Sequence, residues 1–235
     1  MSDYPQISVL TPTYNRSKFL PLYIHNLKSQ SYPHNKIEVV IHDDGTEPFC
    51  DYDRMKETLK PMKLVYHREK VKKTIGEKRN ELVKKLCSSK VVIFMDDDDI
   101  YMDDYIKYSY DCLRDNKAGL VGSNQMLFCY PEKDFKLTGI KCGALVQIHE
   151  ATMCFTRKYF NSMGGFRKSS QGEGADMIKN QKKNVFNTDI NYCMICVAHD
   201  GNTVDKAQFD SPDTELNGKY GGHKVKLLKQ ILSIK

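Results

Sequence analysis

The chain has 235 residues, of which 40% are hydrophobic and 28% are charged, and its formal net charge at pH 7 is +6. This composition excludes a wholly disordered chain, a collagen-like repeat and a fibrous coiled coil, and the length suits one large domain with its own core. The longest apolar run, Cys193–Ala198, is far shorter than the ~20 residues of a membrane-spanning helix. The first residues lack a basic stretch followed by an apolar one, so we expect no secretory signal and a cytoplasmic protein.

The positive charge is concentrated in one segment. Residues 54–90 contain 13 Lys and Arg but only 4 Glu. A basic segment can bind nucleic acid, an anionic membrane surface or a polyphosphate ligand. We expect most of these lysines to lie on solvated helix faces, and we expect no nucleic-acid partner.

Eight cysteines are present, and six of them occur singly. Only Cys193 and Cys196 have the spacing of a metal or redox pair. A zinc site would need a second pair, and a redox motif would begin a helix, whereas this pair lies in a strand-like run. We therefore expect core positions with free thiols.

The first half of the chain alternates strand-like apolar runs with segments whose apolar residues recur at helical spacing. Asn15 or Ser17 is expected to cap the first helix, with Pro21 in its first turn. The predicted elements are a strand at Ile7–Thr11, a helix containing Leu20 and Leu27, a strand at Lys36–Ile41, a helix at Tyr52–Leu59, a strand at Lys63–His67, a helix at Lys73–Leu86, a strand at Val91–Met95 and a helix over residues 102–115.

The pattern changes to strand-like runs and glycine-rich turns after about residue 120. The predicted strands there are Ser123–Tyr130, Ala144–His149, Met153–Phe155 and Tyr192–Ala198, and Tyr220–Lys235 is expected to be a short basic amphipathic helix. That tail could lie on an anionic membrane, which would be a peripheral membrane contact, but we favour docking onto the domain as a terminal helix.

Alternating strands and helices with near-continuous apolar strands predict a mostly parallel sheet covered on both faces. Such sheets bind ligands outside the carboxyl ends of their strands. Polar residues stand at three of these ends: Thr11–Thr13, Asp43 and Asp44, and the four aspartates Asp96–Asp99.

Four consecutive carboxylates at the end of a buried strand repel one another unless a cation neutralises them. Carboxylate oxygens in a sharp turn can hold Mg²⁺ or Mn²⁺ and leave positions open for water and a substrate phosphate. The alternative is a helix N-terminus whose dipole favours acids. One aspartate would satisfy that alternative, so four of them favour a metal site.

Four motifs together resemble the nucleotide-sugar half of family 2 glycosyltransferases, which are inverting enzymes with the GT-A fold. They are Ile7–Arg16 (ISVLTPTYNR), Ile37–Thr46 (IEVVIHDDGT), Arg79-Asn80 and Val92–Asp99 (VIFMDDDD), and the match extends over residues ~6–105. Met163–Phe166 (MGGF) and Gly172-Glu173 resemble, more weakly, the family's acceptor-side turn and acidic motif.

The resemblance implies an α/β fold of the GT-A (nucleotide-diphospho-sugar transferase) type, a single Rossmann-like, mostly parallel sheet with a smaller acceptor-side β region. Residues 1–218 would form the glycosyltransferase domain, with a nucleotide-sugar half at 1–105 and an acceptor half at 106–218, and residues 219–235 would form the C-terminal helix.

The resemblance also implies roles in donor binding. Thr11, Pro12 and Thr13 would line the nucleobase and ribose, and Asp43 or Asp44 would accept a hydrogen bond from uracil. Asp96 would contact the ribose, Asp98 would ligate the metal bridging the phosphates, and Asp99 would lie beside it. The remaining residues implied in nucleotide binding are Asn15, Arg16, Gly76, Arg79 and Asp97.

The catalytic base departs from the family pattern. The acidic motif of the family usually reads Glu-Asp, with Asp as base, but here Gly174 follows Glu173. Glu173 is our first choice as base, Asp176 is the second, and the plain alternative is that Glu173 is only a first-turn helix acid.

His199 follows the predicted strand at Tyr192–Ala198. A late histidine completes the metal site or touches the phosphates in several GT-A enzymes, and this placement is similar, although a lone histidine can equally be structural.

We therefore expect a metal-dependent inverting glycosyltransferase that moves a sugar from a nucleotide-diphosphate sugar, most simply a UDP-sugar, to a hydroxyl of a glycan, protein or lipid, with Mn²⁺ or Mg²⁺ as cofactor. Two alternatives remain. A nucleotidyltransferase of related fold would carry a glycine-rich loop after the first strand, which this chain lacks. The altered acidic motif would suit a catalytically inactive module that binds nucleotide sugars.

Overall fold

A computed structural model describes residues 4–141, 147–179 and 184–234 of the chain. Its strands are β1 (Ile7–Thr13), β2 (Ile37–Asp43), β3 (Lys63–Arg68), β4 (Val91–Phe94), β5 (Ile100–Tyr101), β6 (Leu120–Gly122), β7 (Gln125–Tyr130), β8 (Lys136–Lys141), β9 (Cys154–Thr156), β10 (Val185–Asn187), β11 (Met194–Val197) and β12 (Glu215–Lys219). Its α-helices are α1 (Leu20–Lys28), α2 (Tyr52–Leu59), α3 (Ile75–Glu81), α4 (Tyr105–Asp115), α5 (Arg157–Met163), α6 (Ala175–Ile178) and α7 (Val225–Leu232).

Short helical turns join these elements. They are η1 (Ser17–Phe19), η2 (His34–Lys36), η3 (Leu82–Leu86), η4 (Pro131–Lys133), η6 (Glu150–Thr152), η7 (Ile190–Tyr192), η8 (Ala207–Phe209) and η9 (Pro212–Thr214).

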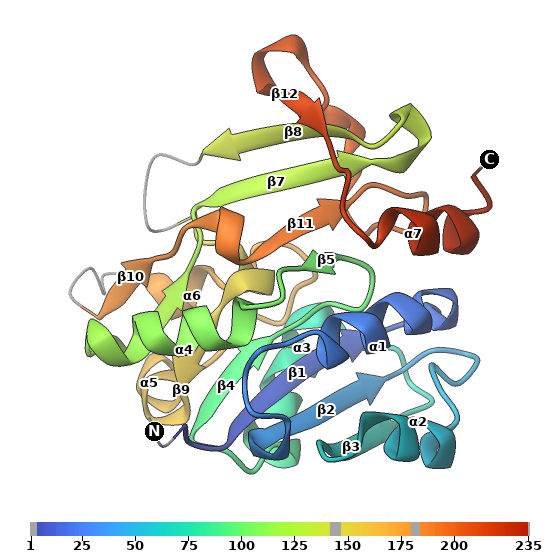
Figure 1. Ribbon diagram of the computed structural model, residues 1–235. Coiled ribbons are helices and arrows are strands. Elements are labelled where there is room, and N and C mark those ends of the chain that lie inside the picture. The colour runs from blue at the N-terminus through green and yellow to red at the C-terminus, as the bar shows by residue number, and fades with distance from the viewer. Residues whose placement is uncertain (1–3, 142–146, 180–183, 235) are drawn as a thin grey trace.

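The larger sheet has the strand order β10-β6-β9-β4-β1-β2-β3 (Figure 1). β1 pairs in parallel with both β2 and β4, and β2 pairs in parallel with β3, while β9 runs antiparallel to both of its neighbours. The predicted mostly parallel sheet is therefore present, and the carboxyl ends of β1, β2 and β4 lie at one edge.

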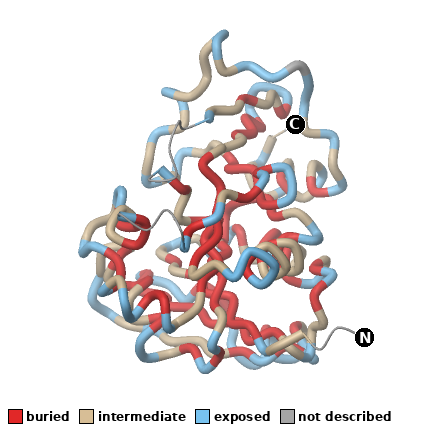
Figure 2. The backbone as a smooth tube through the Cα atoms, turned by 90° about the vertical axis from the view of Figure 1, so that its left-hand side faces the viewer, coloured by how far each residue is buried: buried red, intermediate tan, exposed pale blue. Residues whose placement is uncertain are grey.

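Helices cover both faces of this sheet, as alternation along its strands requires. Val9 of β1 belongs to a core cluster with side chains of α1, α2 and α4, whereas its neighbour Leu10 belongs to a second cluster with side chains of η3, α5 and α6. The buried residues are concentrated in the strands between these layers (Figure 2).

A second sheet, in the order β12-β8-β7-β11-β5, lies above the first in Figure 1. β5 follows the aspartates and pairs with β11, so the end of β4 is connected directly to this sheet. The smaller acceptor-side β region predicted from the sequence therefore forms a sheet of its own.

Most predicted elements are present with shifted ends. The helix predicted at Lys73–Leu86 begins at Ile75, after a capping box made by Thr74 and Glu77, and changes to a π-helical turn at Leu82. The helix predicted over residues 102–115 begins at Tyr105, and the strand predicted at Tyr192–Ala198 is shortened to β11.

Two predictions differ from the structure, and one of them falls partly outside the described residues. Neither Asn15 nor Ser17 caps a helix, because α1 continues directly from η1, which begins at Ser17, and Asn15 has a φ of 52°. Of the strand predicted at Ala144–His149, residues 144–146 are not described and residues 147–149 form no strand.

The cysteines behave as core residues. Cys193 and Cys196 are buried free thiols at and inside β11, and five further cysteines are also free, whereas Cys142 lies outside the described residues. The core prediction for the pair is confirmed.

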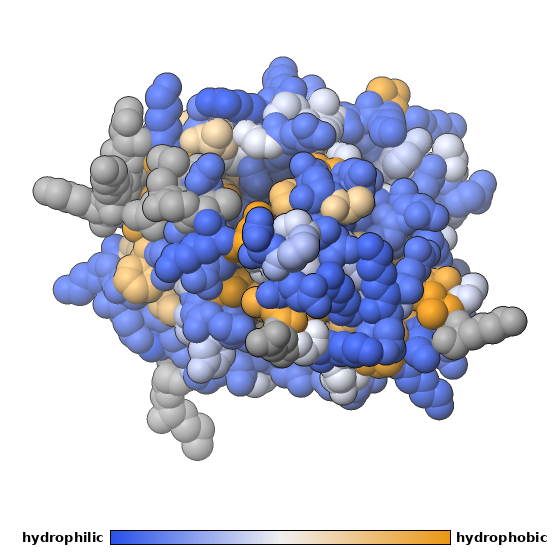
Figure 3. Space-filling view, turned by 90° about the horizontal axis from the view of Figure 1, so that it is seen from above, coloured by the Kyte–Doolittle hydropathy of each residue, from blue (hydrophilic) through white to orange (hydrophobic). Residues whose placement is uncertain are grey.

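The C-terminal helix α7 docks onto the domain. Leu228 is fully buried in a cluster with side chains of α1 and the second sheet, and the ammonium of Lys224 donates to the carbonyl of Tyr101 at 2.6 Å. Among the described residues, none of the helices is long and apolar enough to span a bilayer. The face seen from above, over the second sheet, is mostly hydrophilic (Figure 3).

Glu38 is a buried charge that connects three strands of the larger sheet. Its carboxylate accepts hydrogen bonds from Ser8 at 2.6 Å, from Lys63 at 2.7 Å, and from the backbone and side chain of Ser88 at 2.8 Å. Burial raises the pKa of Glu38, but these donors outweigh burial and hold the pKa below its ordinary value.

We predict that Glu38→Gln lowers the free energy of unfolding at pH 7 by about 1–3 kcal/mol, because buried donors lose a charged acceptor. The folded-state pKa lies below the unfolded value of about 4.3, so this contribution is present above that pH and is lost as the pH falls further. Urea titrations at pH 7 and pH 3 should show the gap between the variant and the wild type closing at the lower pH. Glu57→Gln, at an exposed pair with Lys60, is the matched control, and a gap independent of pH would contradict the assignment.

Candidate functional site

A cavity of about 470 Å³ opens at the carboxyl ends of β1 and β4, between the larger sheet and the segments that follow it. The predicted site residues that line it are Pro12, Arg16, Arg79, Asp96, Asp98, Asp99 and Glu173. His199 lines an adjoining cavity of about 580 Å³, which shares Asn202, Thr203 and Lys206 with the first. The remaining predicted residues, Thr11, Thr13, Asn15, Asp43, Asp44, Gly76, Asp97 and Asp176, do not line the first cavity.

The two threonines of β1 point into the protein. The hydroxyl of Thr11 lies 2.6 Å from that of Tyr23 and donates to the carbonyl of Met95 at 2.7 Å. The hydroxyl of Thr13 donates to the carboxylate of Asp97. Both side chains therefore support the cavity wall without lining the cavity, and Pro12 is the residue of Thr11–Thr13 that lines it.

Asp43 holds the loop that follows β2. Its carboxylate accepts from the backbone N–H of Gly45 at 2.8 Å, from that of Phe49 at 2.9 Å and from the hydroxyl of Tyr66 at 2.6 Å. The side chain is fully buried and Arg68 lies 3.5 Å away. The oxygens predicted to read uracil are thus already engaged.

Asp44 is engaged as well. It accepts from the backbone N–H of Lys73 and from the ammonium of Lys78, both at 2.7 Å, and the same ammonium donates to the carbonyl of Thr13 at 2.8 Å. Burial lowers the pKa of Lys78, and Asp44 opposes this. The sequence-based prediction missed this buried lysine because the basic stretch around it suggested a solvated face.

Two other residues predicted to bind the nucleotide, Asn15 and Gly76, have structural roles. The side chain of Asn15 accepts from the backbone N–H of Thr46 at 2.8 Å and joins the loops after β1 and β2. A Cβ on Gly76 would lie 1.8 Å from the carbonyl oxygen of Arg167, so close backbone packing is sufficient to require glycine there.

Arg79 is buried and lines the cavity, with its guanidinium 4.3 Å from the centre of the Phe94 ring. Its Nε lies 3.2 Å from Glu173 and its Nη2 lies 3.5 Å from Asp96. Within the described part of the chain, Nε and Nη1 have no hydrogen-bond partner. Nε is paired with Glu173, so Nη1 is the nitrogen of this guanidinium that has neither a hydrogen bond nor an ion pair among these residues.

The aspartates after β4 are compensated in different ways. Asp97 is bound by Thr13 and lies 3.3 Å from Arg16, whereas Asp99 accepts from the backbone N–H of Val197 at 2.9 Å. Burial raises the pKa of Asp97 to about 7, and it also raises that of Asp99 well above its ordinary value, with the charge of Asp98 contributing to both.

Asp98 is the aspartate whose charged form is most favoured. Its Oδ2 lies 2.5 Å from Nη1 of Arg16 and 2.9 Å from Nε2 of His199. Burial raises its pKa, but Arg16 and His199 outweigh burial, so the net pKa is lowered. The carboxylate, which lines the first cavity, and the imidazole, which lines the adjoining one, therefore converge on one point.

This pair suits a divalent cation. Two ligands of one ion with bonds of about 2.1 Å lie about 3 Å apart, close to the separation of Asp98 and His199. Oxygen and imidazole donors are those that Mn²⁺ accepts. Oδ1 of Asp96, also buried, has no hydrogen-bond partner among the described residues.

Another group of potential ligands lies away from the cavity, where His42, His67 and Glu69 place ligand atoms within 4.8 Å of one another. Lys73 pairs with Glu69 and also with Glu81, which lies 2.9 Å from His42. The ammonium of Lys73 already neutralises these carboxylates, so we interpret the group as an ion-pair cluster.

The acidic turn separates the two predicted bases. Glu173 faces the cavity, but Asp176 pairs with Arg167 at 2.7 Å on the surface. Burial raises the pKa of Glu173, the charge of Arg79 opposes this, and the neighbouring Glu150 raises it further. Two other cavity residues, Glu150 and Lys206, were not predicted, and no local sequence pattern marks either of them.

Comparison with protein families identifies the class. Residues 8–170 match the family described as glycosyl transferase family 2. Because this match covers more than half of the chain, the chain belongs to that family. A comparison with curated proteins found no match.

Solved structures show the same fold. The mannosyltransferase PcManGT from Pyrobaculum calidifontis, in complex with GDP-Man and Mn²⁺, superposes with a TM-score of 0.66 at 19% identity over 88% of this chain and 60% of that one. S. aureus TarS 1–349 in complex with UDP-GlcNAc gives a TM-score of 0.65 at 16% identity over 84% of this chain and 60% of that one. The GT-A fold predicted from the sequence is confirmed, and the chain spans about 60% of the length of these structures.

We predict that Asp43→Asn destabilises the protein by about 1–3 kcal/mol, because an amide cannot replace a carboxylate that accepts from three donors. Thermal unfolding should show a lower midpoint, whereas Asp53→Asn, at an exposed position of α2, should leave it unchanged. An unchanged midpoint for Asp43→Asn would mean that the loop does not depend on this carboxylate, and would leave it available for base recognition.

Proposed function

We propose that this protein is a metal-dependent inverting glycosyltransferase that uses a nucleotide-diphosphate sugar. The observation that carries the proposal is the convergence of Asp98 and His199, 2.9 Å apart, where the cavity lined by Asp98 and Arg79 adjoins the cavity lined by His199. Membership of glycosyl transferase family 2 supports the reaction class.

The residues of the cavity suit a diphosphate. Asp98 and His199 would hold Mn²⁺ or Mg²⁺, and the ion would offset the charge of the leaving diphosphate. Arg79 would donate to a phosphate oxygen of the sugar nucleotide through Nη1, which has no partner among the described residues. Lys206, at the same cavity, would add a further positive charge.

In this proposal Arg16 stabilises the carboxylates before a cation binds. Its guanidinium contacts both Asp97 and Asp98, so it keeps the carboxylates together until a cation binds. It also donates to the carbonyl of Gly201 at 3.0 Å, which joins the loop after β1 to the loop that follows β11. Binding of a divalent cation to Asp98 would release part of this contact.

Asp43 and Asp44, the residues predicted to read the base, already accept hydrogen bonds from the protein, so the structural neighbours guide the choice of nucleotide. We keep a UDP-sugar as the first donor to test and a GDP-sugar as the second, because structural neighbours have been solved with UDP-GlcNAc and with GDP-Man. The acceptor would be a hydroxyl of a glycan, protein or lipid. Membrane contact through α7 and a cytoplasmic location also remain proposals.

A thermal-shift screen tests the proposal directly. UDP-GlcNAc, UDP-glucose, GDP-mannose and ADP-glucose would be added with and without Mn²⁺, and at least one should raise the melting temperature only with the metal, because a ligand of the folded state stabilises it. No shift with any donor would overturn the proposed function. Binding without turnover would instead favour an inactive nucleotide-sugar module.

We predict that Asp98→Asn abolishes the effect of Mn²⁺ on donor binding and leaves the protein folded, because the amide removes a metal ligand and relieves repulsion between carboxylates. Titration calorimetry with the donor found above should give one affinity with and without Mn²⁺ for the variant. Asp53→Asn should retain the metal dependence of the wild type. A metal dependence retained in Asp98→Asn would show that the ion binds elsewhere.

A further inference from the structure

A displacement reaction at this cavity needs a carboxylate that can take the proton of the acceptor hydroxyl. The cavity offers the carboxylates of Asp96, Asp98, Asp99, Glu150 and Glu173. Asp98 is bound by Arg16 and His199, Asp99 is hydrogen-bonded to the backbone of β11, and Asp96 faces Arg79. The two glutamates are the remaining candidates.

Glu173 is buried and already paired with a cation. Its side chain is only 6% exposed, and Nε of Arg79 lies 3.2 Å from Oε1. Burial raises the pKa of Glu173 and outweighs the opposing charge of Arg79, but the ion pair with Arg79 occupies the carboxylate, so an acceptor hydroxyl would have to compete with a buried guanidinium for it. The ion pair instead suits Glu173 to a positioning role, since it holds Arg79 at the cavity wall.

Glu150 has no such partner. Among the described residues, no Lys, Arg or His forms an ion pair with it, and its Oε1 accepts one hydrogen bond, from the backbone N–H of Gly174 at 3.1 Å. That single bond fixes the direction of the carboxylate without neutralising its charge.

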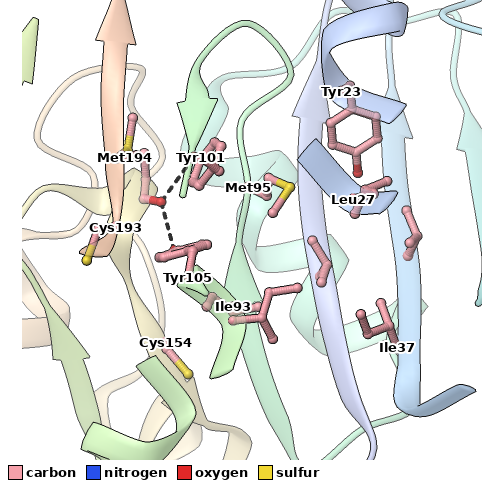
Figure 4. Packing of buried hydrophobic residues seen from close by; sticks show 14 of the residues in the cluster. Tyr23, Leu27, Ile37, Ile93, Met95, Tyr101, Tyr105, Cys154, Cys193 and Met194 are labelled. Atoms are coloured by element: carbon pink, nitrogen blue, oxygen red, sulfur yellow. Dashed lines mark hydrogen bonds between the residues drawn. The ribbon is translucent and has the colours of Figure 1, made fainter. Parts of the chain in front are cut away.

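The backbone around Glu150 is held in place. The hydroxyls of Tyr101 and Tyr105 both donate to the carbonyl of Ala151 at 3.2 Å, as the dashed lines in Figure 4 show. The hydroxyl of Thr152 donates to the carbonyl of His149 at 2.7 Å and accepts from the backbone N–H of Ser123 at 2.8 Å. The turn η6 thus presents Glu150 from a rigid support.

The absence of a side chain at Gly174 leaves room in the acidic turn for the side chain of Glu150, which comes from the turn η6. A Cβ at Gly174 would lie 2.6 Å from Cγ of Glu150 and 3.0 Å from its Oε1. A side chain at position 174 would therefore extend into the space that Glu150 occupies. The φ of −79° at Gly174 is open to any residue, so it is the side chain of Glu150 and the methyl end of Met153, and not the backbone, that limit the space at this position.

We propose that Glu150 is the general base of the transfer reaction, in place of the aspartate that would follow Glu173 in the family's acidic motif. The inference rests on the proposed function. Glu150 takes the proton of the acceptor hydroxyl as its oxygen forms a bond to the anomeric carbon. The bond from that carbon to the diphosphate breaks, and the electron pair leaves with the nucleoside diphosphate.

The test uses hydrolysis of the donor identified by the thermal-shift screen, with water as the acceptor and release of nucleoside diphosphate as the readout. Glu150→Gln should lower kcat by about 10²–10⁴-fold, the usual contribution of a general base, with the KM for the donor within a few-fold of wild type. Glu173→Gln, in contrast, should raise the KM for the donor, because Arg79 loses the carboxylate that holds it at the cavity wall. Glu57→Gln, on the surface of α2, should match the wild type.

A second set of variants separates catalysis from structure. Glu150→Ala removes the carboxylate and opens space, and adding Gly174→Asp should return a carboxylate to it and restore at least ten-fold of the lost kcat. The double variant of Glu150→Ala with Gly174→Ala carries the same Cβ without a carboxylate and should stay inactive. If Glu150 had only a structural role, Asp at position 174 would not restore kcat where Ala at the same position does not.

The outcomes distinguish the two proposals. If no donor binds, the proposed function is overturned and the inference falls with it. If the wild type binds a donor but does not hydrolyse it, or if Glu150→Gln turns over normally, the inference is wrong while the donor site stands. If Glu173→Gln loses kcat at unchanged KM and Glu150→Gln does not, Glu173 is the base predicted from the sequence.

Discussion

The compensation of four adjacent carboxylates is the constraint on which the rest of the site depends. Asp96–Asp99 follow a strand that is paired on both sides, and Asp97, Asp98 and Asp99 are buried, so water screens the repulsion among these carboxylates only weakly. Each carboxylate therefore has a partner from a different segment: Arg79 for Asp96, Thr13 and Arg16 for Asp97, Arg16 and His199 for Asp98, and Val197 for Asp99.

These partners bring the two sheets together. Arg16 comes from the loop after β1 in the larger sheet, while Val197 and His199 belong to β11 and the loop after it. The charge compensation thus links the proposed donor side to the second sheet. A cation at Asp98 would act at this junction, where the cavity residues from both halves meet.

Much of the fold could be predicted from local patterns. The apolar runs of β1, β2 and β4 are continuous because these strands are covered on both faces, and the polar residues after them mark the edge where ligands bind. The aspartates and His199 were found from their position after such runs. The caps of α1 were predicted wrongly, because the turn η1 at Ser17 precedes that helix and removes the need for one.

The sequence by itself determined the parallel strands β1 to β4, the acidic end of β4 and the family, because these depend on residues adjacent in the chain, whereas the placing of β6, β9 and β10 in the larger sheet does not. Only the tertiary structure decided which carboxylates already accept hydrogen bonds from the protein and which are open to a ligand. Asp43 and Asp44 are used by loop amides and by Lys78, and Glu150 reaches Gly174, 24 positions later in the sequence. Such pairings are set by how η6 and the turn before α6 pack beside one another, and no periodicity or spacing in the chain records that packing.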